Sequence, residues 1–363
     1  MKILLPILLA AAVFVPAQAQ TTTRLAATKA NSYALVYTLP STRLRISLEA
    51  EITTRKPGEF HKYAKKYLNI NAPITREEHS ASLRSVVVST EGVADPDQRY
   101  AVQFKSGTEP FMVLSPQGVP LAVNTEQIPD AAAPAIPESR DAEPTPLETP
   151  AARQVVSQEM MQSQSTAKRA ELAAAALFAI RQTRADLISG QADQMPPDGK
   201  SLQLMLDNLE AQEKALMAMF VGTTSTRTQV ETYTVDPDGD ISNLILARIS
   251  AVDGIVSASD LSGSPVYLNL TITRRGEMPL NEKGQRLEFP KNGFAYCIPG
   301  SADVTISYDD RTYFSRSEQF AQFGVTYGLA PNSFTDRKAP IYVILDPATG
   351  AIREQGPAAP SAR

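Results

Sequence analysis

No tryptophan occurs in this sequence, which also has only one cysteine and two histidines among 363 residues. With Cys297 as the sole thiol, no disulfide can form within the chain, so stability has to come from packing. The missing indole rings lower the expectation of a sugar-binding site, because such sites commonly stack sugars on aromatic rings. The net charge of −4 argues against a protein that binds nucleic acid over its whole surface.

The scarcity of histidine also limits catalytic chemistry, since a nucleophilic triad needs a base beside serine or cysteine. His61 lies on the polar side of a short predicted helix and His79 in a polar connection, and neither belongs to a metalloprotease motif. Cys297 lies in a predicted strand, where a small buried apolar residue is a better interpretation than a reactive thiol. We therefore assign no catalytic, cofactor-binding or metal-binding residue, expect no cofactor, and lean against an enzyme.

One acidic segment resembles the start of a calcium loop. Asp236, Asp238 and Asp240 place carboxylates at alternate positions, and Ca²⁺ prefers such oxygen ligands. An EF-hand loop has glutamate at its twelfth position, where this sequence has Ala247. The same segment has the proline and glycine of an ordinary turn between two strands. The sequence leaves both interpretations open.

Residues 1–19 have the three parts of a cleavable secretory signal. Lys2 supplies the positive charge, residues 3–15 the apolar run, and Ala17-Gln18-Ala19 the small-residue cleavage site. The apolar run is shorter than the roughly 20 residues that cross a bilayer, and no nearby cysteine could accept a lipid. We expect an exported protein of the periplasm or the extracellular space, without a lipid anchor or a transmembrane segment in the mature chain.

Two β-rich modules are predicted, at 20–125 with one short helix and at 223–355, followed by a flexible tail at 356–363. Apolar and polar residues alternate from Thr42 to Thr53, which is typical of a strand with one buried face. Turn residues at 115–118 and 346–350 each predict a hairpin. Other strands are expected at 32–39, 83–90, 99–105, 110–114, 119–124, 230–235, 241–249, 266–272, 294–298, 303–308, 321–327 and 341–345.

The two β-rich segments echo each other. Tyr37-Thr38-Leu39-Pro40 precedes an alternating strand, and so does Tyr296-Cys297-Ile298-Pro299. Each segment also ends in a hairpin of similar type. This pattern indicates either duplication of one β module or shared turn chemistry.

Between the modules, residues 126–153 hold six prolines, seven alanines and six acidic residues, with no aromatic residue. Such a segment buries too little apolar surface to offset its ordering entropy, so we expect an extended or disordered linker. Residues 154–222 predict an antiparallel helical hairpin. Its helices are expected at 165–188, with Gly190 after the end, and from the N-cap Asp198 to about Phe220.

A basic cluster consists of Arg55, Lys56, Lys62, Lys65 and Lys66. Tyr63 and Tyr67 lie nearby, so the cluster could hold an anionic envelope component such as a lipid phosphate. The same lysines also suit the solvated face of a short amphipathic helix.

Six segments carry a resemblance, and they are Tyr37–Pro40, Lys56–Phe60, Ala94–Asp97, Ser165–Gly190, Met195–Gly199 and Asp260–Gly263. In this order they resemble the secreted Bacteroidota family catalogued as domain of unknown function 4831. The resemblance covers most of the mature chain. It implies an exported or envelope location and supplies no catalytic residue.

The combined interpretation is an α+β protein with two antiparallel β-rich modules separated by a disordered linker and a long antiparallel helical hairpin. We expect a non-catalytic cell-envelope binding or scaffold protein, whose partner is an envelope protein or an anionic envelope component and not a nucleic acid. One alternative is a hydrolase whose carboxylates meet only in the fold. Another is a calcium-stabilised adhesin-like module.

Overall fold

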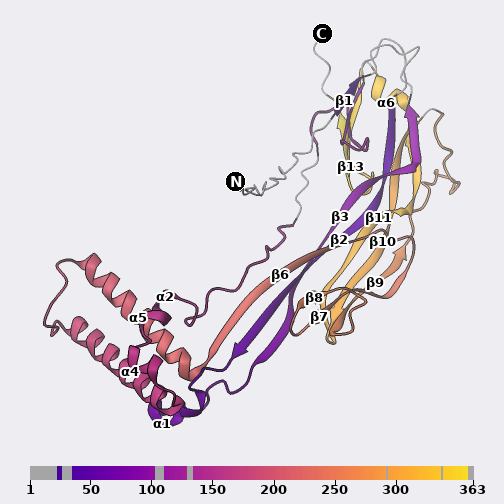
Figure 1. The fold of residues 1–363 in the computed structure, drawn as a ribbon. Helices are drawn as coiled ribbons and strands as arrows, with labels where there is room; N and C mark the ends of the chain where they lie inside the picture. The colour runs from indigo at the N-terminus through magenta and orange to yellow at the C-terminus, as the bar shows by residue number, and fades with distance from the viewer. Residues whose placement is uncertain are drawn as a thin grey trace, which may run out of the picture.

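The computed structural model describes residues 23–26, 35–102, 110–128, 134–291, 293–336 and 338–358. The predicted signal at 1–19 lies outside these residues. The described chain is elongated, with helices at one end, a small sheet at the other, and long strands running between them (Figure 1). Every pairing between its strands is antiparallel, which confirms the predicted α+β class with antiparallel sheets.

The described residues form three sheets. The end sheet has the order β1-β4-β5-β12-β13, with strands at Thr23–Ala26, Phe111–Leu114, Pro120–Val123, Ile341–Leu345 and Ile352–Pro357. The second has the order β11-β10-β9-β7-β8, at Arg311–Leu329, Phe294–Tyr308, Gly263–Arg274, Ile241–Ser250 and Gly254–Val256. The third has the order β3-β2-β6, at Glu78–Val102, Leu35–Lys56 and Thr223–Val235.

The central strand β2 is a single element of 22 residues, where the sequence predicted strands at 32–39 and 42–53. Pro40 does not end the strand, because a register shift between Thr38 and Pro40 accommodates it as a bulge. The partner strand β3 likewise joins the strand predicted at 83–90 with the described part of the one predicted at 99–105. At about 3.3 Å per residue, β2 is roughly 70 Å long.

The two β-rich segments share sheets. β6 pairs with β2 from Lys56↔Thr223 to Leu44↔Val235, and β12 pairs with β5 at Val343↔Val123. The two β-rich segments therefore share the end sheet and the third sheet, whereas the second sheet is built by the C-terminal segment alone. A two-stranded ribbon such as β2–β3 is only marginally stable alone, which is why it needs β6 and a facing sheet.

β2 contributes to apolar cores along its length. Tyr37 and Leu39 pack in the core of the end sheet. The alternating residues from Leu44 to Ile52 pack in the core between the second and third sheets, with at most 2% of any of these side chains exposed. This burial confirms the alternation read from the sequence. Phe60, just beyond the strand, packs in the core of the helices.

The helical end contains the predicted hairpin. α4 (Thr166–Ser189) begins after the N-cap Ser165 and ends at Gly190, which has a φ of 73°. α5 (Gly199–Val221) begins after Asp198, whose carboxylate accepts hydrogen bonds from two backbone N–H groups. The hairpin, its helix end at Gly190 and the N-cap Asp198 are as predicted. The short elements η1 (His61–Tyr63), α1 (Ala64–Leu68), α2 (Pro150–Gln154) and α3 (Gln158–Gln162) pack beside it, while α6 (Pro331–Thr335) lies at the other end.

The segment expected to be an extended or disordered linker is extended over most of its described part and joins α2 at its end. Arg140 exchanges two backbone hydrogen bonds of 2.8 Å with Thr228 of β6. The side chain of Ser139 accepts another from the N–H of Val230 at 2.8 Å. The segment is therefore attached to the free edge of β6.

The echo between the β-rich segments is visible in the fold. Each segment has a long hairpin, β2–β3 or β10–β11, followed by a short one, β4–β5 or β12–β13. The N–H of Thr38 donates to Gly118 in the first short turn at 3.0 Å, and the N–H of Cys297 donates to Gly350 in the second at 3.0 Å. The shared order and these matching bonds favour duplication over coincident turn chemistry.

One buried tyrosine joins β2 to β10. The Tyr37 hydroxyl accepts a 2.6 Å hydrogen bond from the N–H of Ala295 and donates to the Ala295 carbonyl at 3.2 Å.

We expect Tyr37→Phe to destabilise the protein by about 1–3 kcal/mol, because both groups of Ala295 lose this buried partner. Chemical denaturation measures the change. Tyr267→Phe is the control, since no hydrogen bond of the Tyr267 hydroxyl is found within the described chain, and an equal loss in both variants would contradict the assignment.

Candidate functional site

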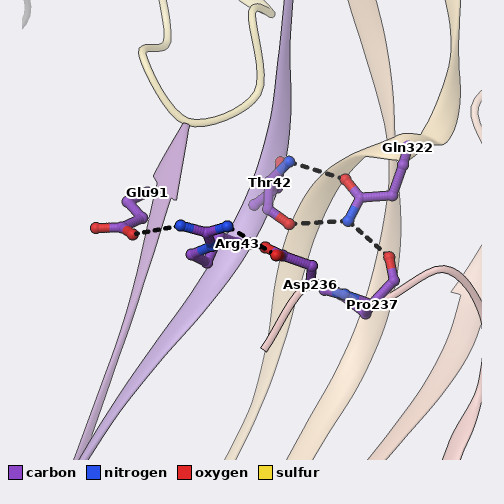
Figure 2. Close-up of polar contacts among 6 residues, drawn as sticks. All are labelled: Thr42, Arg43, Glu91, Asp236, Pro237 and Gln322. Atoms are coloured by element: carbon purple, nitrogen blue, oxygen red, sulfur yellow. Dashed lines mark hydrogen bonds and ion pairs between the residues drawn. The ribbon is translucent and has the colours of Figure 1, made fainter. Parts of the chain in front are cut away.

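A polar cluster forms where β6 ends and β2 continues. Beyond the Leu44↔Val235 pair, the next backbone groups on that edge of β2 belong to Thr42. The Gln322 side chain from β11 takes the place of a strand (Figure 2). Its Oε1 accepts from the Thr42 N–H at 2.9 Å, and its Nε2 donates to the carbonyls of Thr42 and Pro237 at 2.8 and 2.9 Å. This amide therefore completes the hydrogen bonding of β2.

The Thr42 side chain extends the cluster toward the end sheet. Its hydroxyl is fully buried, accepts from the N–H of Ala321 at 2.9 Å and donates to the carbonyl of Ala348 at 2.8 Å. Ala348 lies in the turn between β12 and β13. One threonine thus connects β2, β11 and this turn, which shows that the cluster supports the fold.

Asp236 of the candidate calcium loop belongs to the same cluster. Arg43 donates to both of its carboxylate oxygens, at 2.6 and 2.7 Å, and lies 3.9 Å from Glu91 (Figure 2). The hydrogen bond from Arg43 lowers the pKa of Asp236. Asp240 accepts from the N–H of Ile272 at 2.6 Å. The described residues contain no cluster of three acidic, histidine or cysteine side chains placed to hold a metal ion.

The basic cluster lies at the helical end, around η1 and α1 (Figure 1). Arg55 lies 3.6 Å from Glu78. The other four members, Lys56, Lys62, Lys65 and Lys66, are exposed and form no ion pair with a described carboxylate. Lys65 donates to Asn69 at 2.8 Å, and Lys66 to the Tyr67 hydroxyl at 3.3 Å. The structure therefore keeps several uncompensated positive charges on this surface.

The helical hairpin leaves a large part of its apolar surface uncovered. In α5, the buried side chains all lie between Ala215 and Phe220, and none lies in residues 199–214. Of the large apolar side chains along this helix, only Leu216, Met219 and Phe220 are thus buried. Several large apolar side chains of the hairpin and the adjoining α3 are exposed, namely Met161, Phe178, Ile188, Met195, Leu204 and Met205.

The remaining candidate residues have structural contacts. His61 makes a 2.8 Å hydrogen bond with the Gly58 carbonyl. His79 lies within β3, not in the expected polar connection, 3.3 Å from the Thr54 hydroxyl and 3.4 Å from Glu77. Cys297 is buried as predicted, and this burial raises the pKa of its thiol to about 12. A thiol with that pKa stays protonated near neutral pH and is a poor nucleophile.

The open clefts on the described chain include three with volumes of about 350, 420 and 420 Å³. The smallest lies between the extended segment and α5 and has two carboxylates, Asp207 and Glu210. The hydrogen bond from Lys214 lowers the pKa of Glu210, whereas a general acid needs a raised pKa. This pair therefore gives no support to hydrolase chemistry.

Sequence reasoning missed Gln322, the residue that completes β2. A glutamine in an alternating strand has no local signal, because its partners are far away in the chain. The uncovered state of α5 was also missed, since an apolar stripe predicts a buried face without showing what covers it.

Comparison with known proteins identifies one family. The model of a family described as a domain of unknown function, DUF4831, matches residues 33–353. No curated protein and no solved structure matches the chain significantly. Within the described part of the chain, no helix has both the length and the hydropathy needed to cross a membrane.

We expect Thr42→Val to destabilise the protein by about 2–4 kcal/mol, because the Ala321 N–H and the Ala348 carbonyl both lose their partner. Urea denaturation measures the loss. Thr226→Val is the matched control on the same sheet, and at this exposed position the change should stay within about 0.5 kcal/mol. Equal stabilities of the two variants would show that the Thr42 hydroxyl contributes nothing.

The ion pair of Asp236 predicts a pH dependence. Because its pKa is lowered in the folded state, the carboxylate stabilises the fold above about pH 4, and this contribution disappears as the pH falls through the lowered pKa. The pair is partly exposed, so we expect Asp236→Asn to cost at most about 1 kcal/mol near neutral pH and less in acid. Denaturation curves of wild type and Asp236→Asn, recorded from acid to neutral pH, test this pH dependence. A difference that grows on acidification would contradict the predicted sign.

Proposed function

The chain belongs to the family of domain of unknown function 4831, and we propose that it is a non-catalytic binding or scaffold protein of the cell envelope. Its contact surface is the helical end, and its partner is an envelope protein with a complementary apolar face. Export to the envelope is supported by the signal-like pattern of residues 1–19. Binding of a partner is supported by the exposed apolar side chains of the helical hairpin.

The observation that carries the proposal is the uncovered apolar surface of α4 and α5. The exposed fractions of Phe178, Ile188 and Leu204 are 51%, 66% and 72%. A helical hairpin with apolar residues on more than one side needs a further layer to bury them. Large apolar side chains left exposed on one pair of helices are candidates for a site of protein contact.

The base of the hairpin is well packed, which suits a contact surface held in a defined position. Leu177 of α4 and Leu216 and Phe220 of α5 are fully buried there, beside Phe60. Arg181 and Arg184 of α4 both bind Glu213 of α5, at 2.7 and 2.9 Å. The two helices are thus joined to each other and to the end of β2, while their tip projects.

A second class of partner is favoured by the basic cluster. Lys62, Lys65 and Lys66 are exposed at the same end of the molecule as the hairpin. Such charges attract anionic surfaces over about 10 Å at moderate ionic strength. An anionic envelope component beside the protein partner would therefore contact the same end.

The test is an affinity capture from detergent-solubilised envelope, with the full-length protein expressed from its own signal and tagged at the C-terminus. The wild type should enrich one stoichiometric partner, and the double variant Ile188→Gln with Leu204→Gln should capture at least about tenfold less, as expected for a contact centre. Leu261→Gln is the control, since Leu261 is 83% exposed in the turn between β8 and β9. Exposed substitutions of this kind should leave the unfolding free energy nearly unchanged.

If the wild type and the double variant capture equal amounts of partner, the hairpin is not part of the interface. If no envelope protein is enriched over a tag-only control, the scaffold function is contradicted.

A further inference from the structure

A cleft of about 420 Å³ lies where the second sheet meets the end sheet. Arg274, the last residue of β9, and Arg275 both line it. The other walls come from β10, β11 and the start of β13, and include Pro299, Gln319 and Ile352. The cleft therefore combines two cations with an apolar wall and one side-chain amide.

The two arginines face the same cleft because the strand ends between them. Consecutive residues of a regular strand point to opposite faces. Here the register of β9 shifts opposite Ser301 and Ala302, and the N–H of Gly276 then donates to the carbonyl of Phe323 at 3.0 Å. This turn lets both residues line the same cleft.

Three glycines fix the backbone beneath the arginines. A Cβ atom at Gly276 or Gly324 would lie 2.2 or 2.3 Å from the carbonyl oxygen of Ile298, and one at Gly300 would lie 2.5 Å from that of Phe323. Real Cβ atoms do not approach backbone atoms so closely. Since glycine is required at all three positions, β9, β10 and β11 pack together here with little freedom, which gives the arginine pair a fixed base.

The positive charges of the pair are not neutralised within the described chain. Neither Arg274 nor Arg275 forms an ion pair or a side-chain hydrogen bond there, whereas Arg43, Arg169 and Arg181 each bind a carboxylate at 2.6 or 2.7 Å. Glu277 also lines the cleft but forms no ion pair with either arginine. An anion in the cleft would supply the charge partner that both arginines lack within the described chain.

We propose that this cleft binds a phosphate group, either free or carried by a larger molecule. Each guanidinium presents a planar fork of N–H donors that fits two oxygens. A carboxylate has two oxygens and satisfies one fork, whereas a doubly charged phosphate has enough oxygens for both. The apolar wall at Ile298, Pro299 and Ile352 suits a ligand with an apolar part beside its phosphate.

Binding at this place connects two sheets. Arg274 belongs to the second sheet and Ile352 to the end sheet, which are otherwise joined here by the hydrogen bond from Cys297 to Gly350. A ligand that binds the folded state and not the unfolded chain stabilises the fold by RT ln(1 + L/Kd), where L is the free ligand concentration. The melting temperature should therefore rise with phosphate concentration.

The experiment compares full-length wild type, the double variant Arg274→Gln with Arg275→Gln, and the control Arg45→Gln. Arg45 is exposed on β2 and forms no ion pair with a described residue. Inorganic phosphate is titrated against chloride at equal ionic strength, with calorimetry and melting temperature as readouts. In a second arm, phosphatidylcholine vesicles with and without phosphatidic acid are sedimented with each protein.

Wild type and Arg45→Gln should bind phosphate alike, and the double variant should bind at least about tenfold more weakly, as expected for the loss of two charge-assisted contacts. If wild type binds inorganic phosphate, free phosphate is a sufficient ligand. If wild type binds only the vesicles with phosphatidic acid, the ligand is a phosphate group with an apolar tail. Equal binding by wild type and the double variant, or no binding of wild type in either arm, would overturn the proposal. Because the hairpin is unchanged throughout, the outcome is independent of the capture experiment.

Discussion

The backbone of β2 has to be hydrogen-bonded along 22 residues while it passes two apolar cores and leads to a third at Phe60. β3 satisfies one edge over almost the whole length, and β6 satisfies the other only as far as Leu44. Beyond that point the Gln322 amide serves the N–H and carbonyl of Thr42. The packed second and third sheets, the end sheet and the helical end all contact this strand or its immediate end, so their arrangement depends on its continuous pairing.

This arrangement separates two surfaces with different chemistry. The helical end presents apolar side chains and unpaired lysines, whereas the cleft at the junction of two sheets presents a pair of arginines. The core between the second and third sheets lies between these surfaces and is filled by aliphatic residues and by Phe320 and Phe323. A protein that holds separate contact surfaces at a set distance suits the role of a scaffold better than that of an enzyme with one deep pocket.

Local chemistry made much of the fold predictable. The alternation from Leu44 to Ile52, the helix end at Gly190, the N-cap Asp198 and the turn at Gly118 each depend on neighbours in sequence, and each was identified. The continuity of β2 and β3 was not predicted, because proline and glycine usually interrupt a strand. In this fold a register shift accommodates Pro40, and the Pro347 carbonyl passes close to Gly92, where a larger residue would not fit. Sheet sharing and the arginine cleft arise from residues far apart in the chain, which periodicity does not report.

The length of β2 has a mechanical consequence. If a partner pulls on the helical end while the opposite end is anchored, the force runs along β2, β3 and β6. Hydrogen bonds of an antiparallel ladder lie perpendicular to the strands, so such a force shears many of them at once instead of opening them one by one. A load along the long axis is therefore shared across the whole ribbon, whereas a sideways load on the hairpin falls on the few contacts at its base. The resistance of the fold to force therefore differs between these two directions.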